Sequence, residues 1–423
     1  MDKVKQLFLY GLLLFAFFPI IPNKYKGLPV ILLFVIALFI FFKEKKYKFN
    51  FRKVGFYASL YLLYLISLLV TSNFIEIDKT LTTRLSILVF PLLFGLVRTY
   101  IPSIKQEQLQ VFLATYFMVS ILYFGLIILF FYQLGFFAEE VNINLYYSHL
   151  TYGMWGISQH PIYACMFISI GVLFGLHLLY QLKKTSQKLG IIIGLILLFA
   201  MLLFLSRKGV LLATILASIL HGLYQLKNRK QKKYILIALA IVISMILIAP
   251  VTQKRFKEVF DTKSYTKIEN TNSTSIRFGI YKCAIEKIME NPIFGYGIGD
   301  VQDELDNCYS KTSNMLLEDN YNSHNQYLSI WLSCGIMGLI VFFGFLYLNF
   351  RIAFKQKNIL FICLLLFFCI LMLFENILER QSGVILFSLI VNFSAFITIQ
   401  NHKNSINFDE LNSTNGVAKK KIL

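Results

Sequence analysis

The residues best suited to chemistry in this chain are a histidine and two arginines beside long apolar segments. His324 stands in the polar run Tyr321-Asn-Ser-His-Asn-Gln-Tyr, which leads directly into an apolar stretch. A neutral imidazole near water can accept a proton near neutral pH. Arg207 follows one apolar segment and Arg277 lies in an amphipathic stretch, and a guanidinium can bind phosphate through paired hydrogen bonds. A histidine between arginines at a membrane surface predicts a lipid-phosphate substrate; the alternatives are a capping histidine and arginines that reach toward lipid headgroups.

The composition is that of a membrane protein. Of 423 residues, 57% are hydrophobic and 15% are charged, whereas soluble domains have about 25% charged residues. The apolar residues are concentrated in runs of roughly 17–25 residues, the length with which a helix crosses about 30 Å of hydrocarbon. Short basic loops between these runs explain the net charge of +19, so nucleic acid is not expected as a partner. We therefore expect an all-α polytopic membrane protein.

Twelve apolar segments are predicted to span the membrane. They are residues 6–22, 28–43, 54–73, 85–102, 110–133, 159–181, 190–206, 209–226, 234–250, 325–350, 358–374 and 382–399. The first segment lacks a cleavage site for a signal peptidase and is read as a retained span. Lysine clusters in 45–53, 183–188 and 227–233 alternate with segments such as 135–158, which has no Lys or Arg. This bias places both termini in the cytoplasm.

The chain is expected to have four parts, one of them a large external loop. These are residues 1–250 with nine spans, residues 251–323 as the loop with catalytic elements and short helices, residues 324–400 with three spans, and residues 401–423 as a basic cytoplasmic tail. A loop of this length is usually functional. Its two cysteines, Cys283 and Cys308, either form a disulfide in an oxidising compartment or stay free, because nothing in the sequence fixes their geometry.

Several smaller features of the external segments have simple readings. Residues 275–290 have the spacing of an amphipathic helix that Asn291-Pro292 ends. The following turn, Gly295-Tyr-Gly-Ile-Gly-Asp300, has no strand before it, so a tight connection is favoured over a nucleotide site. The carboxylates that follow are read as a solvated helix face rather than a cation site, and no metal site is predicted; they are Asp300, Asp303, Glu304 and Asp306. His160 in Gln159-His160-Pro161 is read either as an acceptor contact or as a helix cap.

The order of these motifs resembles that of the O-antigen ligase and O-antigen polymerase superfamily, which are bacterial membrane glycosyltransferases. His324-Asn325 followed by Gly335-Ile-Met-Gly338 looks like the family's His-Asn pair and Gly-x-x-Gly. Ser206-Arg207-Lys208-Gly209 is similar to its Ser-Arg-Gly stretch, with an inserted lysine. The resemblance is best from Ser206 to Gly383.

Two further segments have the same resemblance. Arg277, then Asn291-Pro292 and the glycine turn, resembles the family's loop signature, and Tyr281 stands where the family often has tryptophan. Residues 374–383, with Glu375, Glu379 and Arg380, are similar to a segment of ligase-like proteins. The lysine and tyrosine variations leave the branch of the superfamily open.

The resemblance implies a GT-C-like fold and metal-independent, inverting glycosyl transfer with no cofactor. His324 would be the general base on a hydroxyl of lipid A–core oligosaccharide or another glycan acceptor, and Arg207 and Arg277 would bind the diphosphate of an undecaprenyl-diphosphate-linked donor. The possible supporting residues are Asn325, Tyr281, His160 and Lys208. The protein is expected in the bacterial inner membrane, among membrane lipids, with its active site facing the periplasm.

Two alternatives remain from the sequence. An O-antigen polymerase, or another family member, would use the same donor and a different acceptor. A transporter would also have many spans, but transporters usually have ionisable residues near mid-bilayer and repeated halves. Here the ionisable groups are predicted to cluster at the outer surface and no repeat is visible, so transfer chemistry is favoured.

Overall fold

The computed structural model describes residues 2–44, 49–135, 143–226, 253, 257–269 and 272–400, and these are mostly helical. The N-terminal elements are α1 (Asp2–Leu13), η1 (Leu14–Ile20), η2 (Asn23–Tyr25), α2 (Leu28–Glu44), α3 (Phe51–Ser67), α4 (Ile77–Arg84), α5 (Ser86–Val97), β1 (Ser103–Lys105) and α6 (Gln106–Gln133). They are followed by α7 (Ile143–Tyr152), α8 (Pro161–Gln181), α9 (Thr185–Leu205) and α10 (Lys208–Gln225). The remainder comprises η3 (Thr262–Tyr265), α13 (Ser273–Glu290), α14 (Val301–Thr312), α15 (Asn314–Glu318), α16 (Gln326–Lys355), α17 (Ile359–Leu371), η4 (Ile377–Glu379), α18 (Gln381–Phe396) and β2 (Thr398–Gln400).

The helices confirm the predicted class of a polytopic α-helical membrane protein. Eight helical segments in the described part of the chain are long and apolar enough to cross a membrane, and α17 and α18 are shorter apolar helices. Each predicted span contains a helix, except residues 234–250, which lie outside the described residues. The total of twelve spans stays a prediction.

The boundaries differ most where a charge or a short strand interrupts the apolar pattern. The segment predicted at 85–102 contains one helix, α5, and another helix, α4, precedes it; Arg84 is buried at their junction. The predicted loop 103–110 contains β1 and the start of α6, and β1 pairs in parallel with β2. Three-residue strands are too short for a sequence pattern to indicate.

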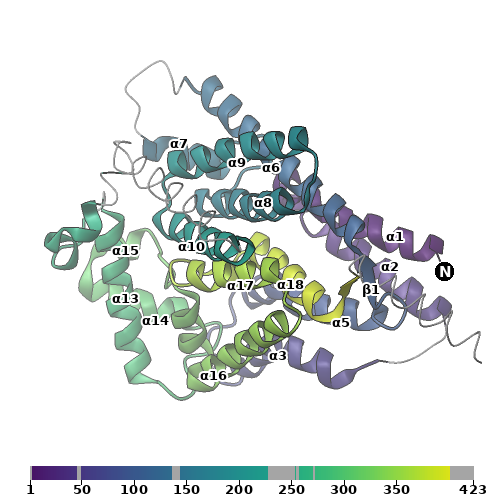
Figure 1. Cartoon of the computed structure of the whole chain (residues 1–423). Coiled ribbons are helices and arrows are strands. Elements are labelled where there is room, and N and C mark those ends of the chain that lie inside the picture. The colour runs from purple at the N-terminus through teal and green to yellow at the C-terminus, as the bar shows by residue number, and fades with distance from the viewer. Residues whose placement is uncertain are drawn as a thin grey trace, which may run out of the picture.

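The two ends of the helical bundle carry different elements. Helices α7, α13, α14 and α15 gather at one end, at the left of Figure 1, whereas the N-terminus and β1 lie at the opposite end. The segments predicted to be external from lysine counts therefore share one end of the protein. We call this the loop end below.

The helices of the loop end have a small hydrophobic core of their own. Ile280 of α13, Leu305 and Tyr309 of α14, and Leu316 of α15 are fully buried against one another, and Leu332 of α16 joins them. Cys283 and Cys308 form a disulfide between α13 and α14, which decides the alternative that the sequence left open. The core and the disulfide fix α13, which carries Arg277, against the bundle.

Replacing both Cys283 and Cys308 by serine is expected to destabilise this substructure without abolishing insertion into the membrane. The disulfide closes a loop of 25 residues, and the chain-entropy model gives it about 3 kcal/mol. Limited proteolysis of the purified protein should therefore cut α13–α15 faster in the double variant, and a reductant should accelerate cleavage only in the wild type. Equal cleavage rates of the two proteins would show that the disulfide adds no stability.

The glycine turn after α13 is a tight connection, as the sequence reading favoured. The backbone N–H groups of Tyr296 and Gly297 donate to the carbonyls of Leu332 and Ser333 at 2.7 and 3.1 Å. At that place α16 is kinked at Gly335, whose φ of 64° is left-handed. A Cβ at Gly335 would overlap the Ile293 carbonyl, so this packing of the turn against α16 requires glycine at position 335.

The acidic residues after the turn also have a structural use. Asp300 accepts hydrogen bonds from the backbone N–H groups of Ser72 and Asn73, at 2.6 and 2.5 Å, just after α3. Asp303 accepts another from the Asn73 side chain at 2.6 Å. Asp303 is exposed, as the prediction of a solvated helix face expects, but the prediction missed that Asp300 and Asp303 hold the α3–α4 connection against the loop end.

One pair of ionisable residues lies inside the bundle, away from the loop end. His177 of α8 and His221 of α10 approach within 3.2 Å between ring nitrogens, and Gln181 contacts His177 at 2.7 Å. Both histidines are buried. The expectation that ionisable groups cluster at the outer surface was therefore wrong for these two residues.

Candidate active site at the loop end

His324 is paired with a buried carboxylate that the sequence reading did not select. It lies in the segment between α15 and α16, where its Nδ1 is 3.2 Å from Oε2 of Glu375. The Glu375 side chain follows α17 and is almost completely buried, whereas the His324 side chain keeps 20% of its exposure. A base next to water with a carboxylate behind it is an arrangement that orients an imidazole for proton transfer.

The side chain of His324 does not cap the helix that follows it. Asn325, not His324, caps α16, and its side chain accepts from the N–H groups of Tyr327 and Leu328 at 3.0 and 3.2 Å. The Tyr281 hydroxyl donates to the carbonyls of His324 and Leu373 at 3.2 and 2.8 Å. His324 itself has a left-handed φ of 43°. Asn325 and Tyr281, predicted as supporting residues, therefore both position the histidine.

The groups around Glu375 favour the ionised form of its carboxyl. Burial alone would raise the pKa of its carboxyl, but the neighbouring His324, together with His160 and Arg277, lowers that pKa to about 2. An ionised carboxylate can only accept at the Nδ1 contact, so Nδ1 carries a proton and Nε2 is the nitrogen left to act as a base.

Replacing Glu375 by glutamine is expected to lower the rate of the reaction that uses His324 while leaving substrate binding nearly unchanged. Hydrogen bonds to charged groups contribute about 1.5–3 kcal/mol, which corresponds to a rate loss of roughly tenfold to a hundredfold. Steady-state kinetics of the purified variant measure this as a fall in kcat with a steady KM. A variant whose kcat equals that of the wild type would exclude a positioning role for Glu375.

The two predicted arginines share one cleft with Glu375. Arg207, Arg277 and Glu375 line it, and its other lining residues are Ile162, Ser206, Lys208, Gly209, Val210, Ser273, Leu371 and Phe374. Arg207 precedes α10 and its guanidinium lies 4.0 Å from the centre of the Tyr147 ring. Arg277 donates from Nη2 to the Phe374 carbonyl at 3.2 Å. The structure therefore brings together the three residues that the sequence selected, since Glu375 joins this cleft to His324.

The residues on either side of Arg207 allow the connection between α9 and α10 to pack closely against Phe374. Ser206 ends α9 with a left-handed φ of 50°, and Gly209 lies against Phe374, where any Cβ would come within 2.6 Å of the ring. Lys208, the inserted lysine, donates to Glu258 at 2.8 Å and to Thr274 at 3.0 Å. These contacts hold the start of α10 against the loop end. The supporting role in the site that the sequence predicts for Lys208 stays a prediction.

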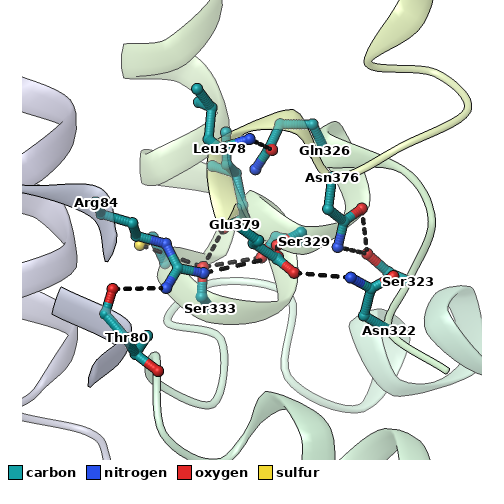
Figure 2. Close-up of polar contacts among 12 residues, drawn as sticks. Thr80, Arg84, Asn322, Ser323, Gln326, Ser329, Ser333, Asn376, Leu378 and Glu379 are labelled. Carbon is teal, nitrogen blue, oxygen red and sulfur yellow. Dashed lines mark hydrogen bonds and ion pairs between the residues drawn. The ribbon is translucent and has the colours of Figure 1, made fainter. Parts of the chain in front are cut away.

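A network of polar contacts joins the segment before α16 to the segment after α17 (Figure 2). Ser323 exchanges hydrogen bonds with the Asn376 side chain, and Gln326 accepts from the Leu378 N–H at 2.6 Å. The His324–Glu375 contact joins the same two segments, residues 322–326 and 375–379. These contacts hold the segment that carries His324 against residues 375–379.

This network continues to an ion pair between Arg84 and Glu379 that the sequence did not predict. Asn322 accepts from the His324 N–H at 3.1 Å and donates to Glu379 at 3.0 Å. Glu379 also accepts from Ser329 and lies 3.7 Å from Nη2 of Arg84, as Figure 2 shows. Arg84 is buried and stacks on Tyr64. An arginine at the outer start of a span was the available signal, because the positive-inside bias makes it unusual there.

His160 lies near the same charges, but its side-chain hydrogen bond is that of a helix cap. Its Nδ1 accepts from the Ile162 N–H at 3.4 Å at the start of α8. The ring is also within electrostatic range of Glu375, Arg207 and His324. The structure thus supports the capping alternative and places the residue beside the site.

The fold and this site define a class: a polytopic membrane protein with a histidine–carboxylate pair and an arginine-lined cleft at the ends of its helices. Residues 192–343 match the family model described as O-antigen ligase. This match supports membership of the O-antigen ligase and polymerase superfamily, whose members are glycosyltransferase-like enzymes. No curated protein matches the chain. The matched region contains Arg207, Arg277 and His324, whereas Arg84 and Glu375 lie outside it.

Proposed function

We propose that the protein is a glycosyltransferase of the O-antigen ligase type. It transfers a glycan from undecaprenyl diphosphate to a hydroxyl of lipid A–core oligosaccharide, without a metal ion and with inversion at the anomeric carbon. The observation that carries the proposal is the joining of His324 to the arginine-lined cleft through Glu375. The family match supports a lipid-linked glycan and a glycan acceptor as substrates in general.

The chemistry needs one proton acceptor and one site for a leaving diphosphate. The acceptor hydroxyl attacks the anomeric carbon, its proton passes to Nε2 of His324, and the bond from that carbon to the diphosphate oxygen breaks. The electron pair leaves with the diphosphate, and Arg207 and Arg277 stabilise the charge that develops there. Glu375 stabilises the imidazolium that forms on His324.

The membrane helices give this chemistry its place. We propose that the loop end faces the periplasm, in accordance with the basic residues of the opposite loops. The lipid tail of the donor then lies among the helices while its diphosphate reaches the cleft at their ends. A donor already activated by diphosphate needs no nucleotide on that face.

The proposal is tested by the lipopolysaccharide of the native host after replacement of the chromosomal gene by a His324→Ala or Arg277→Ala version. We expect the long glycan chains to disappear from lipid A–core while full-length lipid-linked glycan accumulates. Single repeat units attached to the core would instead identify a polymerase, which uses the same donor and another lipid-linked glycan as acceptor. Unchanged glycolipids, at a normal membrane level of the variant, would exclude both enzymes.

A further inference from the structure

Arg380 is an exposed cation at the loop end. It follows Glu379, the residue that pairs with Arg84, in the sequence. It precedes α18, and its guanidinium lies 5.7 Å from the centre of the Tyr163 ring. In the described part of the chain no carboxylate forms a salt bridge with it. Arginine at the outer end of a span goes against the usual charge bias.

The carboxylate nearest in sequence to Arg380 cannot neutralise it, because that carboxylate is occupied elsewhere. Glu379 is turned inward to Arg84, Asn322 and Ser329 (Figure 2). Lys208, by contrast, pairs with Glu258 at 2.8 Å. Among the described residues, Arg380 therefore has no carboxylate partner, and its side chain is exposed.

Arg380 lies beside the base but outside the cleft that holds the other arginines. It is within electrostatic range of His160 and of the Tyr163 hydroxyl, and Glu375 acts on both of these groups too. It is absent from the lining of the cleft that contains Arg207 and Arg277. Arg380 is thus a cationic position separate from Arg207 and Arg277, near His160 and Tyr163.

We propose that Arg380 binds an anionic group, phosphate or carboxylate, of the acceptor molecule. The inference rests on the proposed function, in which Arg207 and Arg277 are occupied by the donor diphosphate. A guanidinium that is exposed and unpaired binds such a group by charge-assisted hydrogen bonds. Arg380 therefore selects acceptors that have an anionic group near the hydroxyl to be glycosylated.

The test is the acceptor dependence of transfer by the purified full-length protein in proteoliposomes. Undecaprenyl-diphosphate-linked glycan is the donor, and the acceptors are lipid A–core, the same molecule with its phosphates removed, and the same molecule with its carboxyl groups reduced. We expect Arg380→Ala to raise KM for native lipid A–core by about tenfold to a hundredfold, since a hydrogen bond to a charged group is at stake. The acceptor that lacks the recognised group should have the same KM with both proteins, which tells phosphate from carboxylate.

The controls separate a lost contact from a general effect of charge. Arg380→Lys should keep part of the affinity, and Lys79→Ala, which removes an exposed cation of α4, should leave every KM unchanged. An Arg380→Ala protein with wild-type KM, or with KM raised equally for all three acceptors, would overturn this inference alone. Absence of transfer by the wild-type protein to any of the acceptors would overturn the proposed function and this inference together.

Discussion

Replacement of His324 by alanine is expected to lower the rate of glycan transfer by about 10²–10⁴-fold, the usual contribution of a positioned general base. The acceptor hydroxyl is a weak nucleophile until its proton is taken, and His324 is the imidazole whose Nδ1 is oriented by an ionised carboxylate. Initial rates of product formation in membranes that contain equal amounts of wild-type and variant protein measure the effect.

The matched control for this substitution is His149→Ala. His149 is an exposed histidine of α7, which lies at the same end of the bundle. Transfer by this variant should equal that of the wild type. A His324→Ala protein that retains more than about a tenth of the wild-type rate would contradict the role of His324 as general base.

Replacement of Arg277 by alanine is expected to lower kcat by about 10²–10³-fold, which is the typical loss when one group that stabilises transition-state charge is removed. Arg277 lines the cleft with Arg207 and is held toward it by its contact with the Phe374 carbonyl. Lysine at this position keeps the charge but loses the planar pair of donors, so Arg277→Lys should recover only part of the rate. Steady-state kinetics with varied donor concentration give both quantities.

Lys282 of the same helix provides the control for Arg277. Its side chain is exposed and it does not line the cleft, so Lys282→Ala should leave kcat and the KM for donor unchanged. Equal losses for the two variants would indicate that the loop end needs net charge rather than a specific guanidinium.

The candidate site residues that could be predicted from the sequence are polar or charged residues that stand at the ends of apolar segments. His324, Arg207 and Arg277 were selected because polar groups at the outer ends of apolar segments are uncommon, and the structure brings all three to one place. Helices were predicted where apolar runs are long, since length and hydropathy alone decide whether a segment can span a membrane.

The partners of these residues depend on pairing across the fold. Glu375 lies 51 positions after His324, and nothing near either residue in sequence indicates that the two side chains meet. Arg84 lies in α4 and Glu379 in η4, and they form an ion pair only because α4 packs against η4. Such contacts follow from tertiary packing, which periodicity does not contain.

Local breaks in regular structure were also beyond the sequence pattern. Gly335 was noted as part of a Gly-x-x-Gly pattern, but it kinks α16 where the glycine turn after α13 packs by backbone hydrogen bonds from Tyr296 and Gly297. The disulfide between Cys283 and Cys308 could be named as an alternative, and only the geometry of α13 and α14 decides it.

The central claim is that His324, paired with Glu375, takes a proton while the arginine-lined cleft holds the diphosphate of the donor. Its most direct test is mass spectrometry of a reaction that contains the purified protein, undecaprenyl-diphosphate-linked glycan and lipid A–core, combined with donor binding measured on the same samples. The wild-type protein should form glycosylated lipid A–core and free undecaprenyl diphosphate in equal amounts, and His324→Ala should bind the donor with unchanged affinity yet form both products about 10²–10⁴-fold more slowly. Products formed by His324→Ala at the wild-type rate, or no products from the wild-type protein, would contradict this account.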